Sequence, residues 1–356
     1  MSTVPVYQAD DPASLAAAVE ASRTALVEYN ASKAAEPLLL HTIAKSSTLI
    51  GIDEAVYRQV EAAIKSGKRH LMLYGPPGTG KTQLASEIAA QVSSNGFTLV
   101  TGSADWTSQD LIGGYQPIGD GKISFIPGIM LRSFDRPIII DELNRCDIDK
   151  VLGPMFTVLS GHTTTLPYRV DVANRDSEQY QIFGTFQPGY AEPKYSPGPE
   201  WRILATINTI DKASLYQMSY ALSRRFAWIF IDVPIDLNGF LFEFITKRKN
   251  KTLTGGNLPL GTILQSVNSI RPIGSAPFID IINHCLVVDA NFDFSAAPDT
   301  GTSQSYLDAF MINVMPMLDG ILQDEIRKVA DAVIEQLDLE PGTASRFKQQ
   351  MISIGL

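Results

Sequence analysis

The octapeptide GPPGTGKT, from Gly75 to Thr82, is the motif from which the fold of this chain is predicted. It fits the pattern GxxxxGK[ST], in which glycines allow successive backbone N–H groups to surround a phosphate. A short apolar run, Leu71–Tyr74, precedes it, and Gln83–Val92 has the pattern of a helix. A strand, a glycine-rich loop and a helix in this order indicate a phosphate-binding loop; the alternative is a Gly/Pro turn that only opens a helix.

Each part of this loop has a predicted role in holding a nucleoside triphosphate. Lys81 would reach the β- and γ-phosphates, and the Thr82 hydroxyl would ligate Mg²⁺. The N-terminus of the following helix adds positive potential toward the phosphates. The predicted nucleotide-binding residues of the loop are Gly75, Pro76, Pro77, Gly78, Thr79, Gly80, Lys81, Thr82 and Gln83.

A second candidate motif follows downstream, where the apolar run Pro137–Ile140 is followed directly by Asp141 and Glu142. In a nucleotidase site, Asp141 would hold Mg²⁺, commonly through water, and Glu142 would polarise the attacking water. An apolar run before two acids usually marks no more than a strand end. Together with the glycine-rich loop, it predicts a site for triphosphate hydrolysis.

Five short apolar runs without polar alternation predict the sheet. Strands that are buried on both faces have this pattern, so we expect a parallel sheet covered by helices. Helical patterns alternate with the runs, as in βαβ units, and the predicted fold class is therefore α/β. The runs are Leu71–Tyr74, Phe97–Thr101, Pro137–Ile140, Arg202–Ile207 and Trp228–Val233.

The pattern along the chain predicts three parts and two inserts. After Pro234 the sequence becomes mostly helical. One insert reads as a β-hairpin that turns at Gly119–Gly121, and the other is polar, aromatic and Pro-rich. The predicted parts are an N-terminal helical segment (1–45), a large α/β domain (46–234) with inserts at 113–128 and 163–200, and a smaller helical domain (235–356).

Composition excludes several classes of protein. With 45% hydrophobic and 19% charged residues among 356, the chain can bury a sizeable core. Its net charge of -9 does not favour wrapping of duplex DNA or binding to anionic membranes, so we expect no direct sequence-specific DNA binding. Two cysteines, no signal-peptide pattern and no apolar run of about 20 residues predict a cytoplasmic protein without a membrane span.

Four segments resemble the AAA+ ATPases, namely GPPGTGKT, IIIDELNR, ATINTID and ALSRRF. The sequence most resembles the MoxR-type and McrB-type members, a group that also contains dynein-related modules, over roughly residues 46–275. The resemblance implies a P-loop AAA+ sheet followed by a smaller helical lid. It also implies ATP as the nucleotide, with GTP as the alternative, Mg²⁺, and a homo-oligomeric ring, most often a hexamer.

The resemblance assigns further site residues. Asn208 falls where such proteins keep a polar sensor of the γ-phosphate. Arg225 matches the arginine finger that acts on the neighbouring subunit's nucleotide, and Arg224 could share or take that role; the alternative is a solvated Arg-Arg pair. Arg145, in the DExNR pattern, faces the subunit interface or forms a surface salt bridge.

One departure from the family pattern concerns the second sensor. MoxR-type chains often place an arginine in a Gly-Ser-Pro-Arg-like start of a lid helix, whereas here Phe278 follows Gly274–Pro277. The nearest arginine is Arg271, which is therefore the candidate for this role and for nucleotide binding.

The resemblance also implies how the base is recognised. Backbone groups of Lys68–Leu71, before the loop, are expected to recognise adenine.

The two inserts resemble the helix-2 insert and the presensor insertion of this group, which line the ring pore or the partner face. Tyr115, Lys122 and Phe125 are the candidates for exposed residues at the tip of the hairpin. The alternative is a hairpin that packs on its own domain.

Three functions fit these features. The first is a MoxR-like ring ATPase, a kind of chaperone that remodels or activates a protein partner. The second is an McrB-like motor that drives a separate nuclease in DNA restriction or antiviral defence; the run Asn208–Ser214 resembles a segment linked to GTP use in that family. The third is a nucleotide-switched scaffold. ATP is expected to be preferred over GTP.

Overall fold

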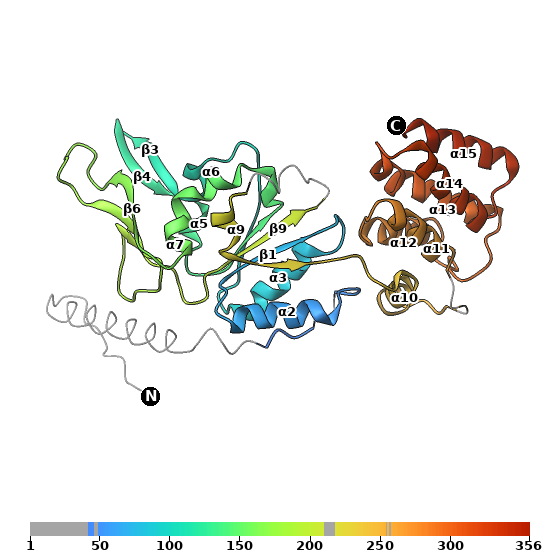
Figure 1. Ribbon diagram of the computed structural model, residues 1–356, viewed down its shortest axis with the longest axis horizontal. Helices are drawn as coiled ribbons and strands as arrows, with labels where there is room; N and C mark the ends of the chain where they lie inside the picture. The colour runs from blue at the N-terminus through green and yellow to red at the C-terminus, as the bar shows by residue number, and fades with distance from the viewer. Residues whose placement is uncertain (1–41, 46–48, 210–217, 254, 256–257) are drawn as a thin grey trace, which may run out of the picture.

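The computed structural model describes residues 42–45, 49–209, 218–253, 255 and 258–356, so most of the predicted N-terminal segment lies outside the described residues. At its centre is a five-stranded sheet in the order β10-β1-β9-β5-β2, with every pair parallel (Figure 1). The predicted P-loop α/β fold class is thereby confirmed. The strands are β1 (His70–Gly75), β2 (Thr98–Thr101), β5 (Ile138–Asp141), β9 (Ile203–Asn208) and β10 (Phe226–Phe230).

Helices cover both faces of this sheet because its strands carry apolar side chains on both. In β1, Leu71 and Leu73 pack with α2 and α3, whereas Met72 packs against the helices of the opposite face. These helices are α2 (Glu54–Lys65) and α3 (Lys81–Val92) on one face, and α4 (Ser108–Leu111), α5 (Ile129–Arg132), α6 (Ile148–Leu152), η2 (Gly153–Met155) and α7 (Phe156–Leu159) on the other.

The predicted hairpin consists of β3 (Gly113–Gly119) and β4 (Lys122–Pro127), which pair antiparallel. Its turn includes Asp120, whose φ of 48° lies in the left-handed region that flanking glycines also adopt. The second insert forms a small sheet of β6 (Thr164–Arg169), β7 (Gln179–Ile182) and β8 (Lys194–Tyr195). Both inserts lie on the same side of the domain, away from its helical partner (Figure 1).

The two inserts pack on one another, which corrects two of the three predicted tip residues. The Tyr115 hydroxyl accepts a hydrogen bond from the Arg169 backbone N–H and donates to the carbonyl of the same residue (3.1 Å). The Phe125 ring is buried against Tyr180, with centroids 4.4 Å apart. Lys122 is exposed as predicted, and the exposed apolar residues of the hairpin are Ile118 and Ile123.

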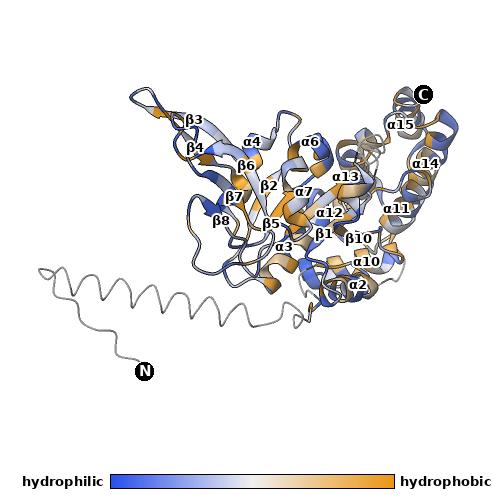
Figure 2. Ribbon diagram, turned by 60° about the vertical axis from the view of Figure 1, so that its left-hand side comes forward, coloured by the Kyte–Doolittle hydropathy of each residue, from blue (hydrophilic) through white to orange (hydrophobic). Residues whose placement is uncertain are grey.

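The chain beyond β10 forms a helical bundle with its own group of buried side chains, which begins at Phe240 (Figure 1). Amphipathic helices build it: in α14, Ile326, Val329, Ala330 and Val333 are buried, and hydrophilic residues alternate with them along the ribbon (Figure 2). Its helices are α10 (Leu237–Glu243), η3 (Phe244–Arg248), α11 (Pro259–Ile270), α12 (Ala276–Val288), α13 (Thr300–Asn313), η4 (Met315–Leu318), α14 (Gln323–Gln336) and α15 (Pro341–Ser353).

Among the helices within the described residues, none is long and apolar enough to cross a membrane.

Candidate active site

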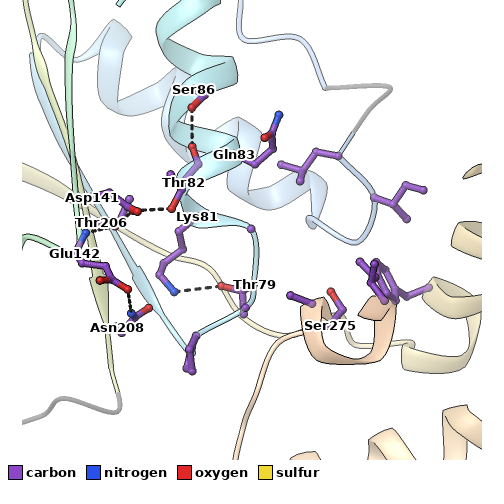
Figure 3. Close-up of a pocket in the computed structure, with 18 of the residues that line it drawn as sticks. Thr79, Lys81, Thr82, Gln83, Ser86, Asp141, Glu142, Thr206, Asn208 and Ser275 are labelled. Carbon is purple, nitrogen blue, oxygen red and sulfur yellow. Dashed lines mark hydrogen bonds between the residues drawn. The ribbon is translucent and has the colours of Figure 1, made fainter. Parts of the chain in front are cut away.

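A cavity of about 590 Å³ lies between the glycine-rich loop and the helical bundle. Three neighbouring strands end at it: β1 at Gly75, β5 at Asp141 and β9 at Asn208. The carboxyl ends of parallel strands are where α/β sheets bind ligands, because the loops that follow the strands meet there. The two sequence motifs and the predicted sensor are thus brought to one place (Figure 3).

The loop has the backbone conformation that a phosphate cradle requires. Gly78 and Gly80 have φ values of 75° and 82°, in the left-handed region that favours glycine. Helix α3 begins at Lys81, and the Gly80 cap offers no side-chain acceptor for the first N–H groups of the helix. These backbone donors therefore fit phosphate oxygens, which would satisfy them in the way a capping side chain does.

The Lys81 side chain is held inside this loop and is only 6% exposed as a residue. Its Nζ donates to the carbonyls of Gly75 (3.1 Å) and Pro76 (2.5 Å). Burial lowers the pKa of the ammonium to about 8, while the carboxylates of Asp141 and Glu142 act in the opposite direction. A triphosphate would replace the carbonyl acceptors with charged ones.

A set of oxygens beside α3 fits a magnesium ion. The Asp141 carboxylate accepts hydrogen bonds at Oδ1 from the hydroxyls of Thr82 (2.5 Å) and Thr206 (2.6 Å) (Figure 3). Carboxylate and hydroxyl oxygens are the hard donors that Mg²⁺ takes, together with waters and phosphate oxygens. Thr206 was missed by the sequence analysis, although it lies two residues before Asn208 and therefore on the same face of β9.

Glu142 is fixed in an unusual backbone conformation at the end of β5. Its φ of 50° and ψ of 47° are left-handed, which costs a non-glycine residue about 1–3 kcal/mol and is found mostly at functional sites. The Glu142 N–H donates to Thr206 Oγ1 (2.9 Å), and the carboxylate accepts from Asn208 Nδ2 (3.3 Å). The polar sensor and the water-polarising acid predicted from the sequence are therefore in contact (Figure 3).

The second oxygen of the Glu142 carboxylate forms an ion pair with Nε of Arg145, in η1 (Leu143–Arg145). The salt bridge predicted as one alternative for Arg145 is present, and a position at a subunit interface stays a prediction. The Arg145 side chain is 61% exposed, and an ion pair at such a surface contributes only about 0.2–1 kcal/mol. The pair therefore adds little to the stability of the fold, and it occupies the carboxylate oxygen that Asn208 does not contact.

The two candidate finger residues follow α9 (Tyr220–Ser223) and differ in their surroundings. The Arg225 guanidinium is engaged within its own domain, where Nε donates to the Phe156 carbonyl (3.0 Å) and to Ser160 Oγ (2.9 Å). The Arg224 residue is exposed. Neither arginine is among the described residues that line the cavity of the same chain.

The structure places Arg271 away from the cavity. Its NH1 donates to the carbonyls of Met317 (2.7 Å) and Asp319 (2.9 Å), within the helical bundle. The cation that the bundle brings to the cavity is instead Arg248, on η3. The predicted base-recognition segment Lys68–Leu71 also lies elsewhere. It contains the start of β1, whereas the glycine-rich loop follows the other end of this strand.

The end of the cavity away from the sheet is apolar, and sequence analysis missed it. It brings together side chains from the segment before α2, from the start of the bundle and from α12. These residues are Leu49, Ile50, Phe240, Phe244, Ala276 and Ile279. An apolar recess next to a phosphate cradle is a suitable place for a nucleobase.

The bundle touches the glycine-rich loop directly. The Gly274 N–H donates to the Pro77 carbonyl (2.6 Å), and the Ala276 N–H donates to the Gly78 carbonyl (3.2 Å). A Cβ at Gly274 would lie 2.0 Å from the Gly78 carbonyl carbon, so the approach requires glycine there. The position of the bundle and the shape of the cradle are therefore linked.

Comparisons with known proteins agree with this arrangement. Residues 70–226 match the family described as AAA domain (dynein-related subfamily). The Holliday junction branch migration complex subunit RuvB of Phytoplasma mali is 33% identical over 100 residues, 28% of this chain and 30% of that protein. RuvB of Thermomicrobium roseum is 31% identical over 130 residues, 32% and 36% of the two chains. The matched stretch spans about a third of the length of these curated relatives.

Among solved structures, a mutant of Thermotoga maritima RuvB is similar with a TM-score of 0.44 and 16% identity, over 84% of this chain and 87% of that chain. The match to the AAA domain (dynein-related subfamily) covers residues 70–226, which hold the glycine-rich loop, Asp141, Glu142 and Asn208.

Proposed function

We propose that this AAA domain binds a nucleoside triphosphate with Mg²⁺ in the cavity and hydrolyses it. The observation that carries the proposal is that the ends of three strands bring Lys81, Asp141, Glu142 and Asn208 together at one cavity. The first N–H groups of α3, which have no capping side chain, lie at the same loop. ATP is the proposed nucleotide, with GTP as the alternative.

The chemistry follows from the positions of these groups. Phosphoryl transfer needs positioning and charge stabilisation more than covalent help from the protein. Lys81 would neutralise charge on the β- and γ-phosphates, and bound Mg²⁺ would supply Lewis-acid stabilisation of the same oxygens. Thr82 and Asp141 would hold the ion. Glu142, oriented by Asn208 and Arg145, would take hydrogen bonds from the attacking water.

The substitution Glu142→Gln tests the proposal. We expect nucleotide affinity within about threefold of the unchanged protein and turnover lower by about 100-fold or more, because only the polariser of the water is lost. Glu61→Gln is the matched control, since Glu61 pairs with Lys65 on α2 and does not line the cavity. Turnover of Glu142→Gln close to that of the control would mean that another group orients the water.

We further propose that the chain works as a homo-oligomeric ring, a hexamer, that acts on a protein partner. The match of residues 70–226 to the AAA domain family and the exposed Arg224 support the ring. The packed inserts, with Ile118 and Ile123 exposed, would offer the partner a surface. Hydrolysis would then drive remodelling of that partner, as in MoxR-type proteins.

A motor that acts with DNA is the second candidate, and two observations favour it. The run Asn208–Ser214 resembles the McrB-type segment, although residues 210–217 lie outside the described part of the chain. The relatives matched over a third of their length are RuvB subunits of a Holliday junction branch migration complex. The net charge of -9 favours a separate nuclease subunit, rather than this chain, as the DNA-binding element.

A further inference from the structure

A row of three side chains from one helical segment lines the cavity: Phe240 on α10 and Phe244 and Arg248 on η3. They are spaced four residues apart. In a regular α-helix a step of four residues overshoots one turn by about 40°, so the third member of such a row rotates away from the first. The segment Phe244–Arg248 is instead a π-helical turn, which is wider. This wider turn offsets the rotation and keeps Arg248 on the face that lines the cavity.

Arg248 comes to the cavity from the segment that also supplies Phe240 and Phe244 to its apolar end. The groups suited to phosphate and magnesium come from α3, β5 and β9, none of which carries Arg248. The other residues of its segment that line the cavity are Phe240 and Phe244, and Phe240 is only 5% exposed. Among the described residues that line the cavity, the cations are Lys81, inside the phosphate loop, and Arg248.

We infer that Arg248 is a base-recognition residue, whose planar guanidinium covers the purine ring held by the apolar end of the cavity. A guanidinium stacks on aromatic faces, whereas a lysine ammonium of the same charge has no plane to do so. Phe240, Leu49 and Ile279 would form the apolar walls around the base. This inference rests on the proposed nucleotide site and names the residue that selects the nucleoside part of its ligand.

The test compares the full-length protein and its Arg248→Gln variant for binding of ATP and of inorganic tripolyphosphate, which has the phosphates and no base. We expect ATP affinity to fall by about 3- to 30-fold, the range that a cation–π contact supplies, and tripolyphosphate affinity to stay unchanged. Arg248→Lys is expected to recover only part of the ATP affinity, because an ammonium retains the charge attraction to the ring and lacks the planar stacking of a guanidinium. Lys247→Gln is the control, since its ammonium pairs with Glu243 (2.8 Å) and does not line the cavity.

The outcomes separate this inference from the function on which it rests. Equal losses for ATP and tripolyphosphate, with rescue by Arg248→Lys, would make Arg248 a phosphate ligand and overturn the inference while the nucleotide site stands. Unchanged affinity of Arg248→Gln for both ligands would also overturn the inference about Arg248, and the nucleotide site would still stand. If the unchanged protein bound neither ligand, the proposed nucleotide site itself would fail.

Discussion

Lys81 is the residue on which the electrostatics of the site depend, because its ammonium is buried and its pKa is lowered to about 8. A bound triphosphate stabilises the charged form and therefore raises this pKa. Above pH 8 the free protein carries a neutral amine, and binding has to take up a proton. We expect nucleotide affinity to be flat below about pH 7 and to fall by up to about tenfold per pH unit above pH 8.

Binding titrations from about pH 6.5 to about pH 9.5, in steps of about half a pH unit, measure this dependence. Lys81→Arg is the control, because a guanidinium stays charged over this whole pH range. The nucleotide affinity of this variant, whatever its absolute value, should therefore not fall with rising pH. Calorimetry in buffers of different ionisation enthalpy should detect the proton taken up. An affinity that stays flat to the alkaline end would place the Lys81 pKa well above the range of the titration.

At the scale of elements, the contact between the bundle and the glycine-rich loop is the most sensitive one. A Cβ at Gly274 would lie 2.0 Å from a backbone atom of Gly78, and backbone cannot turn aside as a side chain can. Gly274→Ala should therefore displace α12 from the loop and open the cavity. Overpacking of this kind costs about 1–3 kcal/mol, so we expect nucleotide affinity to fall by about 5- to 150-fold.

Gly342→Ala, on α15, is the matched control for Gly274→Ala because nothing lies within 4 Å of its added Cβ. Equilibrium binding of ATP and a thermal melt of each variant are the measurements. We expect Gly342→Ala to leave affinity unchanged. If Gly274→Ala bound ATP as tightly as this control, the bundle would yield to the added methyl group at no cost, and its contact with the loop would not shape the site.

The sequence predicts those elements whose signal is local. The phosphate loop and the Asp141-Glu142 pair each lie in a short stretch with its own pattern, and the buried strands show as unbroken apolar runs. Which face of the hairpin becomes buried cannot be predicted in this way, because it depends on contacts with a segment far along the chain. Tyr115 and Phe125 are cross-strand partners, so both turn toward the second insert when it packs there.

The bundle's contribution to the site could not be predicted for the same reason. Arg271 is only three residues from Gly274, yet its guanidinium bonds to carbonyls near residue 318, which pattern along the chain does not reveal. Arg248 reaches the cavity because a π turn changes the register of its helix, and no local sequence signal marks that turn.

For the whole molecule, the contacts of the two arginines after α9 indicate which of them is available to a neighbouring subunit. Arg225 is held by the Phe156 carbonyl and Ser160 of its own domain, and its guanidinium lies 5.5 Å from the Phe156 ring centroid. Arg224 is exposed beside it. We therefore propose Arg224 as the finger and Arg225 as the residue that fixes the position of α9 on α7.

Mixing of variants tests this assignment together with the ring. Arg224→Ala should bind ATP normally and hydrolyse it about 10³-fold more slowly or worse, the effect of losing an arginine finger, and Lys81→Ala should not bind. Combined in one ring, an intact loop of the first variant meets an intact finger of the second, so turnover should recover. If Arg225→Ala complements Lys81→Ala while Arg224→Ala stays active, the roles of the two arginines are reversed. If mixed oligomers form and no pair recovers turnover, each chain works with its own site alone and the ring is not the catalytic unit.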